Sequence, residues 1–410
     1  MEFYQSLYLQ ASYFIISIPF ALFAWLLYYD FTKANIPPGM KHPAKIRAYS
    51  LCTHLVYGLV MFLEMAGICH KYHVLRLALN GVGPKKTSRL IIKDLLFDGV
   101  PVRVYWPNAT TTGTRRGMVY LHGGVGLIGS IYAYQRVCRY IARKSDTVVI
   151  CVGFRLAPEH PCPAQLNDCI TATIYFLKNA EDYGVDPKRI VIGGDSSGGT
   201  LATVVAQHLV FRRALPRVRA QALFYPFLQA VDFNLPSYQQ NQSVPTLLKK
   251  RAIRLGLDYY NKKIKDMDGI MRNAHVPEYI WVKCKKWISA DNIPEEFKAR
   301  GYVPQVPAPF SEKLYEMYKE VFDPIFSPLL AEDCVIRQLP ETFILTCEYD
   351  IVRDDGLLYK KRLEDNGVPV TWNHDHEGFH GILFGIDYGR LEFPGARRNL
   401  EKFTLFLQKL

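Results

Sequence analysis

The sequence lacks closely spaced cysteine pairs. Its nine cysteines are spread over 410 residues and none forms a C-x-x-C pair, so neither a zinc site nor a small disulfide scaffold is predicted. One or two disulfides stay open for a luminal domain. The chain also lacks internal repeats and any basic stretch interleaved with aromatic residues. Its net charge of +12 is therefore interpreted as a solvated face that can lie against anionic lipid, and no nucleic-acid binding is predicted.

Charged side chains are absent from residues 7–29. About 20 apolar residues in a helix span the hydrocarbon core of a bilayer. Pro19 is tolerated in such a helix, and Trp25 and Tyr28 stand where interfacial aromatic rings are expected. A cleaved signal peptide is the less favoured alternative, because no basic segment precedes the run and no small-residue cleavage site follows it. We therefore expect a short tail over 1–6 and a single-pass transmembrane signal-anchor over 7–29.

Two signals on the orientation of this anchor disagree. The residues that follow it are basic, which favours the cytoplasmic side. The N-glycosylation sequons at Asn108 and Asn241 are usable only in the lumen. Both signals are satisfied if residues 48–69 also enter the membrane, but His54 and Glu64 weaken that stretch. An amphipathic helix that packs on the folded domain or lies on the bilayer surface is preferred there.

Strand-like alternation begins near residue 89 and predicts an α/β fold. Asp98-Gly99 splits the first two strands into an antiparallel hairpin. Strands and helices then alternate, which predicts a mostly parallel central sheet covered by helices on both faces. The expected strands are 90–97, 100–106, 117–121, 147–152, 189–192, 220–225, 343–346 and 368–372, with helices over 164–177 and 198–212.

The alternation stops over about 234–340, a stretch rich in Lys, Tyr, Trp and Pro. We interpret this stretch as a helical insertion into one domain, because the strand pattern resumes after it. The expected organisation is a linker and amphipathic helical segment over 30–88, followed by one α/β domain over 89–410.

The strongest chemical signal is the segment Gly194–Gly199, with the sequence GDSSGG, which stands after an expected strand and before an expected helix. Gly-x-Ser-x-Gly in that context forms a nucleophile elbow, a tight turn in which side chains two residues from the serine would collide. Only Ser196 has glycine at both positions, Gly194 and Gly198, so Ser196 is the predicted nucleophile. The N–H of Ser197 then faces a developing oxyanion. The alternative is a glycine-rich helix start with an N-capping serine.

A second glycine-rich segment, His122–Gly126, ends an earlier expected strand. Consecutive glycines let backbone N–H groups approach a ligand oxygen, as in HGGG-type loops that complete an oxyanion hole. With His122 as motif support, Gly123, Gly124 and Val125 are the predicted donors. The alternative is an ordinary strand-to-helix turn.

A carboxylate and a histidine follow the last two expected strands. Asp350 stands nearest to the end of its strand, at the edge where the sites of α/β sheets assemble, and is the predicted acid. Asp354 and Asp355 lie further on and are expected to cap the next helix. His380 lies in a loop after the last strand and is the predicted base.

His374 and His376 are expected at the surface or in support of the site. Three nearby histidines would also suit a metal. The carboxylate geometry of a metal site is missing and a full Ser-Asp-His set is present, so no metal and no cofactor is predicted. Ser, Asp, His is the chain order of α/β hydrolases. In this interpretation His380 removes the Ser196 proton during attack on an acyl carbonyl, and water then releases the acyl group.

With these motifs in place, the sequence resembles the arylacetamide deacetylase family, in the hormone-sensitive-lipase-like branch of the α/β hydrolases. The resemblance covers essentially the whole chain. It implies a single-pass protein of the endoplasmic reticulum with a luminal catalytic domain. It also implies a cap over the site, formed by the segment after the anchor and by the insertion, and cofactor-free hydrolysis of lipophilic carboxylic esters and aryl amides. Besides the anchor, the segments that carry it are His122–Gly124, Phe154–His160, Gly194–Gly199, Leu235–Gln240, Ser327–Leu330, Asp350–Gly356 and Gly378–Gly381.

Two positions depart from the pattern of that family. Val125 stands where the family has a third glycine, and a β-branched residue narrows the accessible backbone angles. If its N–H is lost as a donor, the rate falls by on the order of 100- to 1000-fold. Ser197 replaces the usual alanine. We expect a serine hydrolase of lipophilic esters or amides that contacts membrane lipid; the alternative is a weakly active or inactive hydrolase-fold protein that binds lipid or a protein partner. The sequence does not identify a protein partner.

Overall fold

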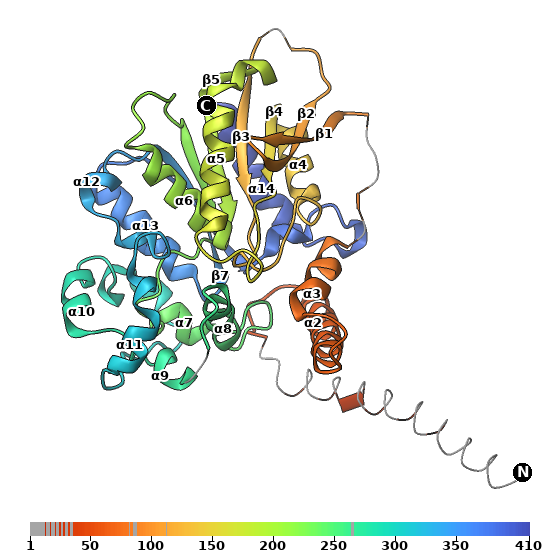
Figure 1. Ribbon diagram of the computed structural model, residues 1–410. Coiled ribbons are helices and arrows are strands. Elements are labelled where there is room, and N and C mark those ends of the chain that lie inside the picture. The colour runs from red at the N-terminus through yellow and green to blue at the C-terminus, as the bar shows by residue number, and fades with distance from the viewer. Residues whose placement is uncertain are drawn as a thin grey trace, which may run out of the picture.

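The computed structural model describes residues 36–81, 83–84, 88–111, 113–263 and 266–410, together with isolated positions between 13 and 32. The tail expected over 1–6 and the anchor expected over 7–29, taken as a span, lie outside these described residues. Within the described part, the chain folds around one central β-sheet (Figure 1).

The central sheet contains eight strands in the order β1-β2-β4-β3-β5-β6-β7-β8. β2 pairs antiparallel with both β1 and β4, whereas every pair from β4–β3 to β7–β8 is parallel. The expected mostly parallel α/β fold is therefore confirmed. The strands are β1 Leu90–Phe97, β2 Val100–Pro107, β3 Arg115–Leu121, β4 Thr147–Val152, β5 Val185–Asp195, β6 Ala220–Phe224, β7 Glu341–Tyr349 and β8 Val370–Phe379.

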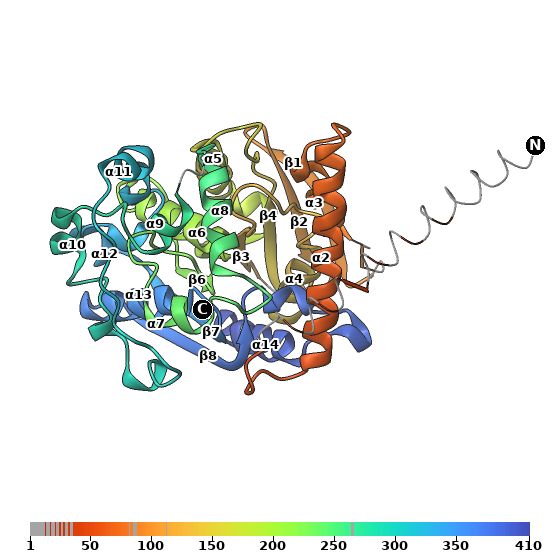
Figure 2. The ribbon, with the colours of Figure 1, turned by 90° about the horizontal axis from the view of Figure 1, so that it is seen from below.

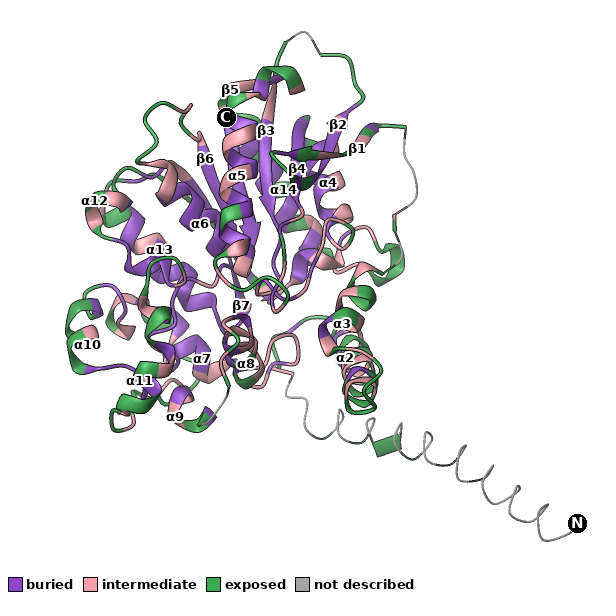
Figure 3. Ribbon diagram, in the orientation of Figure 1, coloured by how far each residue is buried: buried purple, intermediate pink, exposed green. Residues whose placement is uncertain are grey.

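The β1–β2 hairpin turns at Asp98 and Gly99, whose φ values are 45° and 84°. Two positive φ values are typical of a two-residue type I′ turn, which matches the twist of the flanking strands. β1 lies at the edge of the sheet and leaves Ile91 and Leu96 exposed. The central parallel strands are buried on both faces, as Figure 3 shows.

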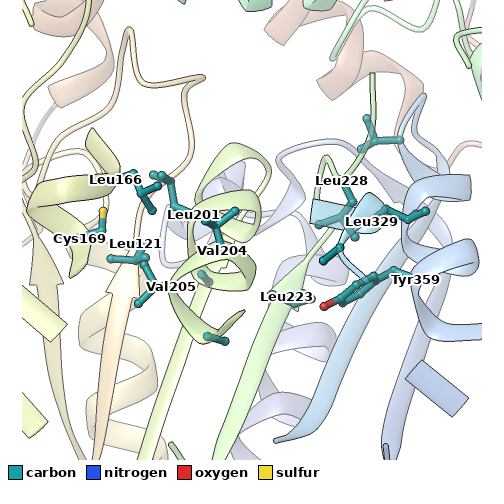
Figure 4. Close-up of a cluster of buried hydrophobic side chains, with 14 of the residues drawn as sticks. Leu121, Leu166, Cys169, Leu201, Val204, Val205, Leu223, Leu228, Leu329 and Tyr359 are labelled. Atoms are coloured by element: carbon teal, nitrogen blue, oxygen red, sulfur yellow. The ribbon is translucent and has the colours of Figure 1, made fainter. Parts of the chain in front are cut away.

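Alternate residues of the strands face two separate apolar layers. On β3 and β4, Val119 and Ile150 point into one cluster, while Tyr120 and Cys151 point into the other. The first layer is covered by α5 (Ala164–Lys178), α6 (Ser197–Leu209) and α13 (Arg353–Asp365), and Figure 4 shows part of it. The second layer is covered by α4 (Gln135–Ser145) and α14 (Pro394–Lys409).

The insertion between β6 and β7 is helical, and no strand lies within its described residues. Ile253, Trp287 and Leu314 of the insertion belong to the same apolar cluster as α5 and α6, so the insertion extends the main core (Figure 1). Its α-helices are α7 Pro236–Gln240, α8 Lys249–Tyr259, α9 Met267–Met271, α10 Glu278–Cys284, α11 Glu312–Tyr318 and α12 Asp333–Ile336.

Two helices precede the sheet: α2 (Pro43–Met65) and α3 (Lys71–Asn80). Figure 2 shows α2 running along one side of the domain. α2 buries only Ile46, Ser50 and Val60 of its 23 residues. Among the described helices it alone is long and apolar enough to cross a membrane, by length and composition only. The helix expected within 48–69 thus exists, begins earlier than expected, and packs on the domain through a small part of its surface.

Replacing Leu223 by alanine tests the first apolar layer. Leu223 is fully buried on β6, and its truncation leaves a cavity beneath the helices (Figure 4). We expect a loss of about 2–5 kcal/mol in the free energy of unfolding, seen as a lower thermal midpoint. Leu405→Ala on α14 is the matched control, because Leu405 is exposed and its truncation removes little packing. Equal midpoints for the two variants would contradict this assignment of the core.

Candidate active site

Ser196 occupies a sharp turn at the carboxyl end of β5. β5 ends at Asp195 and α6 begins at Ser197, which leaves Ser196 between them with φ 54° and ψ −123°. Residues other than glycine rarely adopt these backbone angles, so the turn is strained. The N–H of Ser196 donates to the carbonyl of Phe224 at the end of β6, which holds the turn against the sheet.

The glycines around Ser196 are required by close packing. A Cβ on Gly194 would stand 2.3 Å from the carbonyl oxygen of Leu121 and 2.5 Å from that of Gly198. A Cβ on Gly198 would stand 2.1 Å from the same Leu121 oxygen. These atoms are backbone and cannot move aside, so the Gly-x-Ser-x-Gly spacing follows from the sharpness of the turn.

Ser196, His380 and Asp350 lie in one hydrogen-bonded line. His380 Nε2 is 2.9 Å from Ser196 Oγ, and His380 Nδ1 is 2.8 Å from Asp350 Oδ2. An ionised carboxylate only accepts hydrogen bonds, so Nδ1 carries the proton and Nε2 is left to accept from the serine. The three residues come from the ends of β5, β7 and β8, which are close because parallel strands end at one edge.

The glycine-rich loop after β3 distributes its N–H groups unevenly. Gly123 N–H donates to Tyr134 Oη and to Asp195 Oδ1, at 3.0 and 3.1 Å. Val125 N–H donates to Ser197 Oγ at 2.7 Å. The N–H groups of Gly124 and Ser197 have no acceptor within the described residues. Of the four donors expected for an oxyanion, Gly124 and Ser197 are therefore free, Gly123 is engaged away from the site, and Val125 is bound to a side chain.

Comparison with known proteins places these residues in a family. The pattern of the α/β-hydrolase-fold family matches residues 118–278 and 289–384. Human arylacetamide deacetylase-like 4 is 43% identical over 91% of this chain and 92% of its own length. Arylacetamide deacetylase of Bos taurus is 38% identical over 85% and 89%. The chain belongs to the arylacetamide deacetylase family of α/β hydrolases. The resemblance expected from the motifs is thereby confirmed.

Solved esterase structures share this fold. An esterase from the archaeon Pyrobaculum calidifontis has a TM-score of 0.60 at 24% identity, with 83% of this chain and 89% of that chain covered. Carboxyl esterase 2 from the fungus Tuber melanosporum has a TM-score of 0.59 at 22% identity, with 80% and 88% covered. At these identities the likeness shows that this member of the arylacetamide deacetylase family has the α/β-hydrolase fold.

Asp195 connects the glycine-rich loop to the turn at Ser196, a role that the sequence analysis missed. Besides the Gly123 N–H, its carboxylate accepts from Tyr120 Oη at 3.0 Å and Tyr134 Oη at 2.9 Å. Burial raises the pKa of Asp195 to about 6, although these hydrogen bonds oppose the rise. The signal in the sequence was its position directly before Ser196.

His122 lies beneath the same loop. It is buried and stacks on Phe154, with the ring centroids 4.1 Å apart. Burial lowers the pKa of His122 to about 4, so this histidine is neutral at neutral pH and acts as a packing group.

Asn241 corrects a prediction. Its side chain is fully buried, so it is not accessible to a glycosyltransferase in the folded protein. The amide Nδ2 donates to the carbonyls of Asp350 and Glu348 at 2.9 and 3.1 Å, and Oδ1 accepts from Arg300. Asn241 therefore holds the turn that carries Asp350, the predicted acid. The other sequon residue, Asn108, is exposed directly after β2.

Asp354 and Asp355 do not cap a helix as expected. They lie buried in the first turn of α13, and their carboxylates accept hydrogen bonds from the segment that enters the insertion. Asp354 accepts from the N–H of Ser237, and Asp355 from the N–H of Leu228. Burial raises the pKa of Asp355 to about 8. The expectation failed because, apart from Arg353 beside Asp354, the partners of these carboxylates are more than a hundred residues away in sequence.

The two remaining histidines differ in burial. The side chain of His374 is almost fully buried and contacts Thr346 Oγ1 at 2.9 Å and Glu348 Oε2 at 3.2 Å, so it supports the end of β7 that precedes Asp350. His376 is exposed. Within the described residues no group of three or more His, Cys, Asp or Glu side chains is arranged for a metal ion, and the nine cysteines are unpaired.

Substituting Asp195 by asparagine tests the buried carboxylate through pH. An unfolded aspartate has a pKa near 3.9, so between about pH 4 and 6 the folded protein holds a proton that the unfolded chain has released. The protonated Asp195 carboxyl therefore stabilises the fold at low pH. This stabilisation is lost as the pH rises through that range, by up to about 1.4 kcal/mol per pH unit.

Asparagine does not titrate. From about pH 4.5 to 6.5 the thermal midpoint of Asp195→Asn should therefore rise relative to that of the wild type. Above that range the difference between the two midpoints should stay constant. Thermal unfolding of both proteins across this range measures the difference. A difference that is independent of pH would contradict the assignment.

Proposed function

We propose that this member of the arylacetamide deacetylase family is a serine hydrolase of lipophilic carboxylic esters, acting through an acyl-enzyme intermediate. The observation that carries the proposal is the hydrogen-bonded line from Ser196 through His380 to Asp350. A serine hydroxyl is a weak nucleophile until an adjacent base takes its proton, and this line supplies that base and its orienting acid.

The reaction has two halves. In the first, Ser196 Oγ attacks the acyl carbonyl while His380 Nε2 takes the hydroxyl proton. Collapse of the tetrahedral intermediate breaks the bond to the leaving alcohol, which receives that proton from His380. In the second half, His380 takes a proton from water, the resulting hydroxide attacks the acyl-enzyme, and Ser196 recovers its proton as the acid departs. Asp350 stabilises the imidazolium in both halves.

The oxyanion of each intermediate is stabilised by the free N–H groups of Gly124 and Ser197. Ser197 is the first residue of α6, so the positive end of the helix dipole adds to its N–H. The steps consume only ester and water, so the proposal includes no cofactor.

Apolar side chains beside the glycine-rich loop support a lipophilic substrate. Val125 packs in a small cluster that includes Leu127 of the loop, Val60 of α2, Tyr72 of α3 and Tyr259 of α8. We infer that the segment 30–88 and the insertion together form a cap over Ser196. The names of the relatives favour acyl groups on aryl amines as a second substrate class.

A weakly active or inactive lipid-binding protein is the second candidate. It is favoured by one observation, the engagement of Val125 N–H, which removes a donor from the oxyanion site. The intact triad line favours the enzyme.

A fluorophosphonate probe separates the two candidates. We expect covalent labelling of Ser196 in the folded protein and none in Ser196→Ala. His380→Ala should lower kcat for an aryl ester by on the order of 10⁶-fold, and Asp350→Asn by on the order of 10⁴-fold. The matched control His376→Ala alters an exposed histidine and should retain activity. If the folded wild-type protein is not labelled by the probe, the enzyme proposal is wrong.

The proposed location is the membrane of the endoplasmic reticulum, with residues 7–29 as a single-pass anchor and the triad in the lumen. The uncharged run over 7–29 supports the anchor, and the exposed face of α2 supports a contact with lipid. The exposed sequon at Asn108 supports the luminal side.

Glycan mapping tests this location. In mammalian cells, Asn108→Gln should abolish the mobility shift produced by endoglycosidase. Asn241→Gln should leave that shift intact and lower the thermal midpoint, because it removes buried hydrogen bonds. An unglycosylated wild-type chain that stays in the membrane after alkaline extraction would place the triad on the cytoplasmic side.

A further inference from the structure

Val125 is held in a conformation that valine rarely adopts. Its φ is 59°, between 109° at Gly124 and 66° at Gly126, so three consecutive residues have positive φ values. Glycine takes such values freely, whereas a β-branched side chain meets its own backbone there. The loop therefore needs contacts from outside to keep Val125 in this turn.

Two contacts supply that restraint. The N–H of Val125 donates to Ser197 Oγ at 2.7 Å, at the short end of the range for such bonds. The side chain of Val125 packs in the small apolar cluster with Leu127 and Tyr259. Ser197 directly follows Ser196, so the first contact joins the glycine-rich loop to the nucleophile turn.

We propose that Ser197 is a positioning residue for ester hydrolysis. Its hydroxyl fixes the left-handed turn at Val125 by accepting a hydrogen bond from the Val125 N–H. The inference rests on the proposed serine-hydrolase function. In this role Ser197 Oγ only accepts a hydrogen bond, and no bond to it forms or breaks. The N–H of Val125 is structural, and the turn it stabilises presents the neighbouring N–H of Gly124 to the oxyanion.

This role makes Val125 and Ser197 a coupled pair. Valine at position 125 needs the Ser197 hydroxyl to stay in the left-handed turn, because the conformational preference of valine disfavours that turn. Glycine at position 125 makes the same turn unaided. The contribution of the hydroxyl to the rate should therefore depend on which residue stands at position 125, and a double-mutant cycle measures that dependence.

The cycle compares the full-length wild type, Ser197→Ala, Val125→Gly and the double variant in detergent. The readouts are the second-order rate of fluorophosphonate labelling, and kcat and KM for a short-chain p-nitrophenyl ester. We expect Ser197→Ala alone to lower the labelling rate and kcat by about 10- to 100-fold with little change in KM. On the Val125→Gly background the same substitution should change kcat by less than about 3-fold. Ser197→Thr, which keeps the hydroxyl, should retain most of the rate.

Ser130→Ala is the matched control. It removes another hydroxyl from the same loop, whose partners are Asn80 of α3 and the N–H groups of Tyr132 and Ala133, and it should leave the rates unchanged. Thermal midpoints of all variants establish that each is folded, and Ser197→Cys replaces Ser197→Ala if the latter does not fold.

Equal losses on both backgrounds would overturn the inference. A Ser197→Ala variant faster than the wild type would also overturn it, because the hydroxyl would then block a donor. Failure of the proposed function looks different: the wild type would not be labelled, or labelling would survive Ser196→Ala.

Discussion

One buried carboxylate, directly beside Ser196, fixes the geometry of the site. Asp195 gathers hydrogen bonds from Tyr120 on β3, Tyr134 at the start of α4 and the N–H of Gly123. A carboxylate taken out of water must find such donors, because its desolvation is otherwise very costly. The loop after β3 and the turn after β5 are therefore bound to one group, and the free N–H groups lie beside Ser196 as a result.

Asp350 is held by a different part of the chain. The Asn241 amide binds the backbone of the Asp350 turn, and Glu348, at the end of β7 just before that turn, contacts Arg300 and His374. Although burial opposes it, the hydrogen bond from His374 and the charges of Arg353 and Arg300 lower the pKa of Glu348 to about 2. Asn241 and Arg300 both belong to the insertion. The insertion thus positions Asp350, whereas the sheet and α4 position Ser196.

The sequence was sufficient wherever neighbouring residues decide the structure. Asp98-Gly99 defines the hairpin, and Gly194 with Gly198 identifies the turn at Ser196, because in both cases the constraint is local backbone geometry. It was insufficient where the partner is distant. Asn241 was interpreted as a glycan acceptor although it is buried against the Asp350 turn. The Gly123 N–H was assigned to an oxyanion, although Asp195, 72 residues on, accepts it. The roles of the triad residues stay predictions.

The position of the insertion has a consequence for how this fold can vary. β6 and β7 pair directly in the sheet, with Ala220 opposite Glu341, although the whole insertion separates them in the chain. The entropy of closing such a loop grows only with the logarithm of its length, at about 0.6 kcal/mol for each doubling. Exposed segments of the insertion that neither contact the Asp350 turn nor contribute side chains to the apolar core can therefore be lengthened, shortened or replaced at little thermodynamic cost. Substrate range can diverge there while the chemistry at the sheet edge is retained.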